Sequence, residues 1–229
     1  MRNLKTQLIV ALSATALLSA CSGNDEIAPL EGERISVLEL EESLEPDDAL
    51  LEQQGLIAPG AWKNSFWPQA GGYPNHSMQN LDLNSGQLKK LWSADIGAGS
   101  TDEIPLTAQP VLVDGEIFTL DTEANLTAFD VKTGKRVWQI DITNEKEDDQ
   151  VIGGGIAYAS GVLYVTSGFD EVLAVHPANG EVFWRKKIPA PSRAAPTIMG
   201  GRLYVTTLDN RLLALNAKDG NILWEHAGL

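Results

Sequence analysis

A stretch of ten residues that ends in tryptophan occurs three times in this chain, and the repeat limits the possible folds more than any other feature. The copies read FDVKTGKRVW (129–138), VHPANGEVFW (175–184) and LNAKDGNILW (215–224). In each copy a glycine precedes the tryptophan by four residues. The pairs are Gly134 with Trp138, Gly180 with Trp184, and Gly220 with Trp224. Such self-similarity indicates a protein built from repeated structural units.

Two further landmarks extend each copy toward the N-terminus. An aromatic residue lies sixteen positions before each glycine, and a second glycine lies three positions before that aromatic residue. The aromatic residues are Phe118, Tyr164 and Tyr204, and the second glycines are Gly115, Gly161 and Gly201. Trp92 precedes Trp138 by 46 residues, the same interval that separates Trp138 from Trp184. We therefore place three repeats at about 109–142, 154–188 and 195–226.

Each repeat predicts four short strands. In the first copy these are QPVLVD, EIFTLD, LTAFDV and RVWQID, and glycine marks the turns VDGE and KTGK because tight hairpins need φ > 0. Segments such as LYVTS alternate with the period of a strand. Four-stranded units of this length predict an all-β fold, a β-propeller in which each unit is one blade. We expect the repeated tryptophans to pack between blades.

The charge of the chain is unevenly distributed. The formal net charge is −14, which disfavours binding to nucleic-acid phosphates. Between Asp25 and Glu52 there are eleven acidic residues and one basic residue, Arg34. A segment of this composition buries little apolar surface, so residues 21–61 are predicted to be a flexible acidic tether. Aromatic residues, glycines and prolines begin at residue 62, and the partial propeller is predicted to span 62–229.

The N-terminus is typical of a signal peptide, here residues 1–20. Arg2 and Lys5 precede an uncharged apolar run at 8–20, which is too short to span a bilayer as a helix. The run ends in LSAC, which resembles the bacterial lipobox, and Cys21 is the sole cysteine. We predict that Cys21 is lipidated, with acyl chains such as palmitate holding the protein on a membrane. The alternative is a cleaved secretory peptide with an incidental cysteine.

The residues that commonly carry catalysis do not group in this sequence. His76, His176 and His226 are scattered, and Gly153-Gly154-Gly155 lacks the Lys-Ser/Thr of a phosphate-binding loop. We interpret the three glycines as a flexible entry to a blade. The acidic residues of the repeats fall in predicted turns, where Asp stabilises the bend. They are Asp114, Asp121, Asp130, Glu181, Asp209 and Asp219. The sequence predicts no catalytic, cofactor-binding or metal-binding residue.

The segment AFDVKTGKRVW (128–138) resembles the repeat of quinoprotein alcohol dehydrogenases. Together with the lipobox and the acidic tether, it resembles the BamB family, lipoproteins of the outer-membrane β-barrel assembly machinery. The stretches 67–81, 92–100 and 192–224 are similar to the entry region and a blade of that family. A dehydrogenase of the quinone (PQQ) type would need Ca²⁺ ligands and an Asp base, and many carry a cysteine pair, which this chain lacks.

The resemblance implies an eight-bladed propeller on the periplasmic face of the outer membrane of a Gram-negative bacterium. It implies a non-catalytic scaffold that binds the POTRA domains of the central barrel-assembly protein, other assembly lipoproteins and unfolded outer-membrane clients. A PQQ-dependent dehydrogenase and a lipid-anchored propeller for another envelope protein are the alternatives. Three repeats are fewer than eight blades, so we expect a C-terminally truncated chain, with partner-contact residues beyond Leu229 and a last sheet edge prone to association.

Overall fold

The structure is a computed structural model that describes residues 59–83, 85–143 and 153–228. All of them belong to one compact unit, Ala58–Leu229. The predicted signal peptide, Cys21 and nearly all of the predicted tether lie outside the described residues. In the part that is described, the regular secondary structure consists of twelve β-strands.

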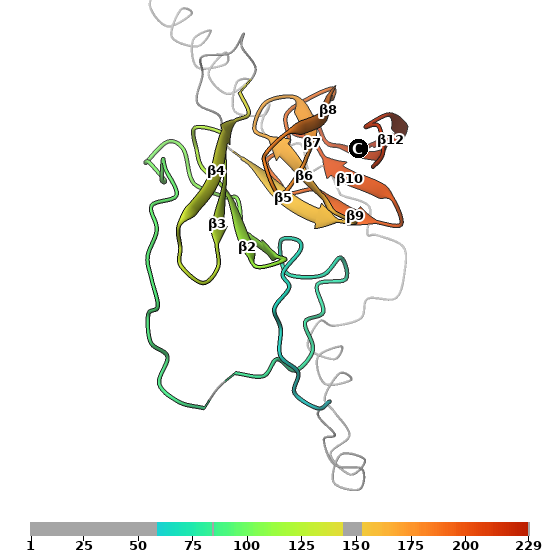
Figure 1. The fold of residues 1–229 in the computed structure, drawn as a ribbon. Coiled ribbons are helices and arrows are strands. Elements are labelled where there is room, and N and C mark those ends of the chain that lie inside the picture. The colour runs from blue at the N-terminus through green and yellow to red at the C-terminus, as the bar shows by residue number, and fades with distance from the viewer. Residues whose placement is uncertain (1–58, 84, 144–152, 229) are drawn as a thin grey trace, which may run out of the picture. The chain divides into compact units, whose positions relative to one another are not determined.

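The strands form three four-stranded sheets, which we call blades 1, 2 and 3 (Figure 1). Blade 1 contains β1 (Val111–Val113), β2 (Glu116–Leu120), β3 (Asn125–Asp130) and β4 (Arg136–Asp141). Blade 2 contains β5 (Gly154–Ala159), β6 (Val162–Ser167), β7 (Glu171–Val175) and β8 (Val182–Lys187). Blade 3 contains β9 (Thr197–Met199), β10 (Arg202–Thr206), β11 (Arg211–Asn216) and β12 (Ile222–Ala227).

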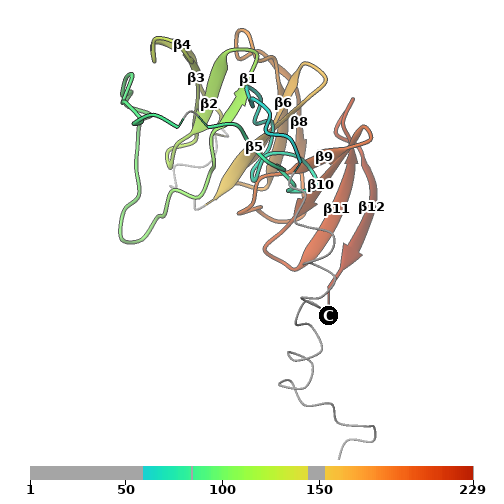
Figure 2. The ribbon, with the colours of Figure 1, turned by 90° about the horizontal axis from the view of Figure 1, so that it is seen from below.

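Each blade is an antiparallel meander in which neighbouring strands follow one another in the sequence. The first strands of successive blades contact each other, β1 with β5 and β5 with β9, and Figure 2 shows the blades arranged one after another. We therefore call β1, β5 and β9 the inner strands, and β4, β8 and β12 the outer strands.

The core lies between the blades and not within a single one. One cluster joins blade 1 to blade 2 and includes Phe118, Leu126, Leu163 and Leu173, all fully buried. A second cluster joins blade 2 to blade 3 and includes Leu203 and Leu213. Because blade 2 has a neighbour on each face, nearly all of β6 and the whole of β7 are buried. The alternating pattern expected for LYVTS therefore does not mark a buried face and an exposed one.

The last hairpin of each blade has the same turn. The N–H of Gly134 donates to the carbonyl of Asp130 at 2.8 Å, and the equivalent bonds join Gly180 to His176 at 2.9 Å and Gly220 to Asn216 at 2.8 Å. The glycines have φ values of 68°, 75° and 70°, which an L side chain rarely adopts. A shift in strand register occurs at the equivalent position in the third strand of each blade, that is, in β3, β7 and β11. The repeated decapeptide is therefore one closing turn, built three times.

The predicted fold class is confirmed: the described part of the chain is all-β, in four-stranded propeller blades. The ring size of eight blades stays a prediction. The interpretation of the glycine triplet is wrong in part, because Gly154 and Gly155 lie in β5. Glycine is needed in β5 for close packing and not for flexibility, because a Cβ at Gly155 would lie 2.5 Å from the Cβ of Ala195.

Candidate interaction surface

A tryptophan that precedes each blade in the sequence binds the closing turn of that blade through its indole N–H. The Nε1 atom donates to a backbone carbonyl in the closing turn of the following blade, three residues before the turn glycine. The three bonds are Trp92 to Val131 at 2.9 Å, Trp138 to Pro177 at 2.7 Å and Trp184 to Ala217 at 3.2 Å. A half-buried tryptophan thereby satisfies its polar atom while its ring packs at the junction.

The ring of the same tryptophan lies against the turn glycine of the following blade. A Cβ added to Gly134 would lie 2.6 Å from the ring of Trp92. The corresponding distances are 3.0 Å from Gly180 to Trp138 and 2.8 Å from Gly220 to Trp184. The glycines are therefore required twice, once for their positive φ and once because the ring occupies the place of a side chain. We call the glycine and the accepting carbonyl together the tryptophan seat.

Three consecutive residues, Trp67, Pro68 and Gln69, bind the inner strands of all three blades, and we call them the strap. Trp67 exchanges two backbone hydrogen bonds with Leu112 of β1, at 2.6 Å and 3.0 Å. Tyr158 of β5 donates its N–H to the carbonyl of Pro68 at 2.7 Å. Proline has no N–H, so at blade 2 the strap can offer only its carbonyl.

The third contact of the strap uses a side chain in place of the backbone. Gln69 Nε2 donates to the carbonyl of Ile198 in β9 at 3.0 Å, and the N–H of Ile198 donates to Gln69 Oε1 at 3.1 Å. The Gln69 side chain is buried and so acts as a substitute peptide group. Leu112, Tyr158 and Ile198 occupy the same position in their blades, opposite Ile117, Leu163 and Leu203. The strap therefore contacts one residue per blade.

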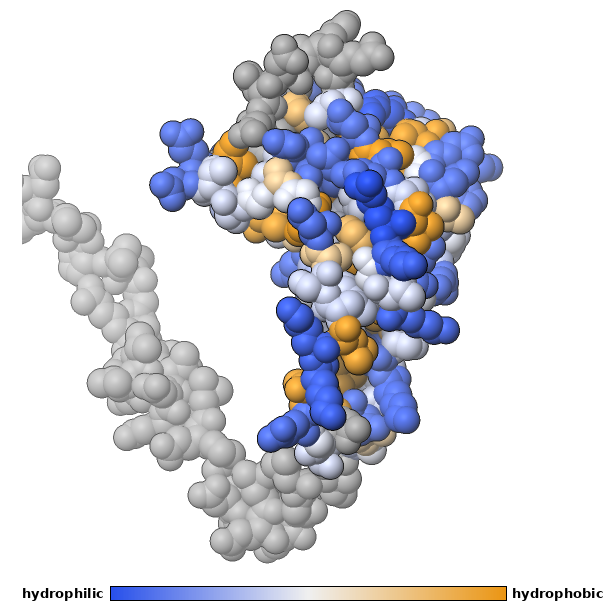
Figure 3. All heavy atoms as spheres, turned by 60° about the vertical axis from the view of Figure 1, so that its left-hand side comes forward, coloured by the Kyte–Doolittle hydropathy of each residue, from blue (hydrophilic) through white to orange (hydrophobic). Residues whose placement is uncertain are grey.

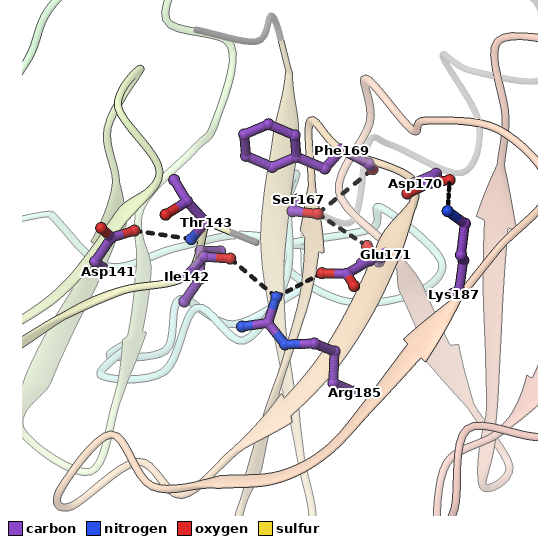
Figure 4. Close-up of polar contacts among 9 residues, drawn as sticks. All are labelled: Asp141, Ile142, Thr143, Ser167, Phe169, Asp170, Glu171, Arg185 and Lys187. Carbon is purple, nitrogen blue, oxygen red and sulfur yellow. Dashed lines mark hydrogen bonds and ion pairs between the residues drawn. The ribbon is translucent and has the colours of Figure 1, made fainter. Parts of the chain in front are cut away.

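A charged group connects blade 2 to the end of β4 (Figure 4). The Arg185 guanidinium donates to the carbonyl of Ile142 at 3.1 Å and pairs with the buried carboxylate of Glu171. Nearby, Lys187 pairs with Asp170 at 2.9 Å. A buried ion pair is by itself weak support for stability, but the bond to Ile142 ties the two blades together at this point.

The outer strands form a sheet edge in every blade. The residue just before the tryptophan is apolar and about half exposed in all three: Val137 at 48%, Phe183 at 50% and Leu223 at 49%. Backbone groups at a sheet edge can pair with a further strand, and apolar side chains at alternate positions add contact area. On the face drawn in Figure 3, apolar residues lie in separate patches among polar ones. The outer edges are the candidate surface for an extended polypeptide.

An open groove lies between the segment after residue 61 and the inner strand of blade 3. It has a volume of about 510 Å³, and Trp62, Tyr73, Pro74 and Met199 are among its lining residues. The Nε1 atom of Trp62 is buried without a hydrogen-bond partner among the described residues. The lining of the groove is mainly apolar and contains no charged side chain that would indicate the chemistry of a ligand.

Of the acidic residues expected to stabilise turns, Asp114 instead accepts the hydroxyl of Tyr158 in β5 at 2.8 Å, whereas Asp121, Asp130 and Asp209 accept hydrogen bonds from their own turns. Asp130 accepts hydrogen bonds from the hydroxyl and N–H of Thr133, and these bonds, the hydroxyl first, hold the pKa of Asp130 below its usual value. The pKa of Asp209 is lowered by the hydroxyl of Thr207, with Arg211 adding to the effect. Asp121 accepts bonds from the N–H groups of Ala98, Glu123 and Asn125.

Among the described residues, no three His, Cys, Asp or Glu side chains lie close enough together to hold a metal ion. Of the scattered histidines, His176 accepts the N–H of Ala178 through Nδ1 within its closing turn, and His226 lies in β12. Carboxylates that already accept hydrogen bonds within turns are poorly placed to serve as the Ca²⁺ ligands that bound PQQ would need. The residues present in this part of the chain therefore do not build a quinone site.

Two features of this surface were missed by the sequence analysis. The contact of each tryptophan with the following blade could have been inferred from Trp92, which keeps the repeat spacing although no four-stranded unit contains it among the described residues. Gln69 carries no such signal, because nothing in WPQAGG distinguishes a buried amide from an exposed one. The part of the chain that the structure describes also contains no helix long and apolar enough to cross a membrane.

Substituting a seat glycine should destabilise the protein more than substituting a glycine of equal backbone geometry. Gly180 (φ 75°) and Gly161 (φ 83°) lie in two turns of blade 2, but a Cβ at Gly161 would meet nothing within 4 Å. Both alanine variants strain the backbone, and Gly180→Ala also presses on Ile140 and Trp138 of β4. We expect Gly180→Ala to lower the free energy of unfolding by about 1–3 kcal/mol more than Gly161→Ala, measured by urea denaturation. Equal losses would show that the ring contact contributes nothing.

Removing the Gln69 amide should loosen blade 3. Gln69→Ala leaves the N–H and carbonyl of Ile198 without their partner, which costs about 1–3 kcal/mol when such groups stay buried. We expect faster hydrogen exchange at the Ile198 amide and a lower urea midpoint. The matched control is Gln87→Ala at an exposed position, which should change neither quantity. Unchanged protection of Ile198 in Gln69→Ala would contradict the role of the strap.

Two family models match parts of the chain. One, described as "Outer membrane protein assembly factor BamB", matches residues 123–229. The other, described as "Glucose/ethanol/alcohol dehydrogenase, beta-propeller domain", matches residues 77–161. Among solved structures, the quinohemoprotein alcohol dehydrogenase from Comamonas testosteroni is similar with a TM-score of 0.59 and 22% identity, over 72% of this chain and 28% of that one. At this identity the likeness concerns the fold alone.

Curated relatives of both kinds are similar to the chain. The outer membrane protein assembly factor BamB of Xanthomonas campestris is 31% identical over 116 residues, 49% of this chain and 28% of the relative. The 1-butanol dehydrogenase (cytochrome c) of Thauera butanivorans is 25% identical over 165 residues, 67% of this chain and 23% of the relative. The chain thus spans between a fifth and a third of the length of these relatives. Over residues 123–229 the chain is thus similar to assembly factors named BamB, and its fold is that of propeller blades built from PQQ-type repeats.

Proposed function

We propose that the protein is a non-catalytic scaffold for outer-membrane protein assembly, held on the periplasmic face of the outer membrane through a lipidated Cys21. It binds the POTRA-containing barrel-assembly protein and other assembly lipoproteins, and it assists the insertion of β-barrel clients. The likeness to assembly factors named BamB supports the general role.

The observation that carries the proposal is the recurrence of an exposed apolar residue on the outer strand of each blade. Val137, Phe183 and Leu223 are about half exposed and occupy equivalent positions. An unfolded β-barrel protein is an extended chain with alternating apolar side chains, and such a chain can add as a strand to a sheet edge. Three edges at regular spacing would hold it at several points, which raises the overall affinity above that of one edge.

The inner edges are poorly suited to the same task. The strap already binds Leu112 of β1, Tyr158 of β5 and Ile198 of β9. An incoming peptide would have to displace these bonds before it could pair with an inner strand. Client binding is therefore assigned to the outer strands.

A dehydrogenase is the second candidate, favoured by the match of residues 77–161 and the likeness to 1-butanol dehydrogenase. Against it stands the use of Asp121, Asp130 and Asp209 as acceptors within turns. Reduction of an artificial electron acceptor by the chain with added PQQ, Ca²⁺ and an alcohol would overturn the scaffold proposal.

Charges on the outer edges should weaken binding of an extended client. We expect the combined variant Val137→Lys, Phe183→Lys and Leu223→Lys to bind an unfolded outer-membrane β-barrel protein about tenfold more weakly than the unchanged chain, a loss near 1.4 kcal/mol. Fluorescence anisotropy of a labelled client, diluted from urea, measures the affinity.

The matched control places three lysines at the exposed Ser85, Gln87 and Ser93, away from any strand edge. It adds the same charge and should retain client binding. Equal binding by the two variants would contradict the assignment to outer edges. Affinity purification from native membranes, with a bait shown to extend past Leu229 and the barrel-assembly protein sought by mass spectrometry, tests the partner: its absence would remove the support for the assembly complex.

A further inference from the structure

A tyrosine fills part of the junction between blades 1 and 2. Tyr158 of β5 packs against the core cluster that joins these blades, and its hydroxyl donates to Asp114 Oδ2 at 2.8 Å. Its ring also meets the ring of Phe66 edge-on, at a centroid separation of 5.9 Å. A phenol ring is therefore held between the inner strand of blade 2 and the first turn of blade 1.

The junction between blades 2 and 3 has equivalent strands but lacks this tyrosine. Ile198 of β9 occupies the position that Tyr158 has in β5, as the strand registers show. Ser160 (φ 51°) occupies the position of Asp114 (φ 50°), just before the glycine of the first turn of the blade. Isoleucine is shorter than tyrosine and has no hydroxyl, so it leaves open the space that corresponds to the phenol ring.

A pocket of about 530 Å³ lies at this junction. Its lining on blade 2 includes Ser160 and Tyr164, and its lining on blade 3 includes Ile198, Met199 and Lys218. Every lining residue belongs to one of these two blades, and all four strands of both blades are described. The volume is in the range of pockets that hold small organic ligands.

The lining of this pocket suits an aromatic ring that carries an anionic group. Tyr164 stands where blade 1 has Phe118, and so it adds a hydroxyl to the junction. Burial alone raises the pKa of Tyr164, so this hydroxyl stays protonated at neutral pH. Ser160 and Lys218 supply a second hydroxyl and an amine, and none of the lining residues carries a carboxylate. These groups can donate hydrogen bonds to an anionic substituent while apolar side chains contact the ring.

We propose that the pocket between blades 2 and 3 binds a small aromatic carboxylate, whose ring takes the place that corresponds to the ring of Tyr158. The ring packs against Ile198 and Tyr164, which are both buried. The carboxylate accepts hydrogen bonds from Ser160 and from the Lys218 ammonium, and the bond to the ammonium is strengthened by charge. The site is separate from the outer strands, so the proposal does not rest on the client-binding role.

The test measures binding of para-hydroxyphenylacetate to the full chain by isothermal titration calorimetry, corrected for a blank without protein. We expect a Kd of about 1 mM or lower, as for other ligands of this size. Cyclohexylacetate keeps the carboxylate but has no aromatic ring, and it should bind about threefold more weakly or less. N-acetyltyrosinamide keeps the phenol but has no charge, and it should also bind more weakly. If the neutral amide binds as tightly as the acid, the site takes a tyrosine side chain of a polypeptide, and the proposed ligand class is overturned.

Two variants locate the ligand in the pocket. Ile198→Tyr combined with Ser160→Asp rebuilds the pair found between blades 1 and 2, so it should fill the pocket and weaken binding by about tenfold or more. An unchanged urea midpoint shows that this variant keeps its fold. Lys218→Gln removes the charge at the pocket and should weaken binding by about threefold or more. Its matched control is Lys132→Gln, at the same position in the closing turn of blade 1, which should leave the affinity unchanged.

Absence of binding at about 10 mM of the aromatic acid would overturn the proposal. Binding that survives Ile198→Tyr with Ser160→Asp would also overturn it, because the ligand would then lie elsewhere. Tyr73→Ala removes an aromatic residue from the groove beside Trp62 and should leave the affinity unchanged, and a loss there would place the ligand in that groove instead. Client binding by Lys218→Gln should equal that of the unchanged chain, so failure of this proposal is distinguishable from failure of the scaffold role.

Discussion

The contact between a tryptophan and the closing turn of the next blade is the interaction on which the rest of the structure depends. A four-stranded sheet cannot bury both of its faces alone, so each blade is stable only beside a neighbour. The ring lies on Gly134, Gly180 or Gly220, and the indole N–H reaches a carbonyl three residues earlier. One side chain thus fixes both the separation and the register of two blades, and the core clusters fill the space that remains.

Much of this arrangement could be predicted from the sequence, because glycine and tryptophan recur at constant spacing and their roles are local. The strands of the first repeat were expected within one or two residues of those observed, since turn glycines such as Gly115 and Gly134 limit them. The strap could not be predicted. Gln69 is separated from Ile198 by 129 residues, and no pattern within the peptide reports a contact made at such a distance. Burial on both faces of blade 2 is likewise a property of the assembled blades.

The chain is similar to both assembly factors and dehydrogenases because all of them share the same structural repeat. The repeat specifies how blades stack and leaves the turns and edges to carry function. In this chain a turn carboxylate such as Asp130 accepts hydrogen bonds from the turn itself. The outer strands carry exposed apolar residues at equivalent positions. The chemistry that distinguishes the two classes therefore lies outside the repeat motif.

The strap also determines how the propeller would respond to mechanical load. A pull applied through the N-terminal side of the chain meets the backbone bonds of Trp62 to Asn80 and Asp82 and then the strap, which lies before β1. The load is shared at once among β1, β5 and β9, because each holds one residue of the same short peptide. A pull on an outer strand would instead act on a single blade. A protein fixed to a surface by its N-terminus would, with this attachment, pass tension to three blades through one short peptide.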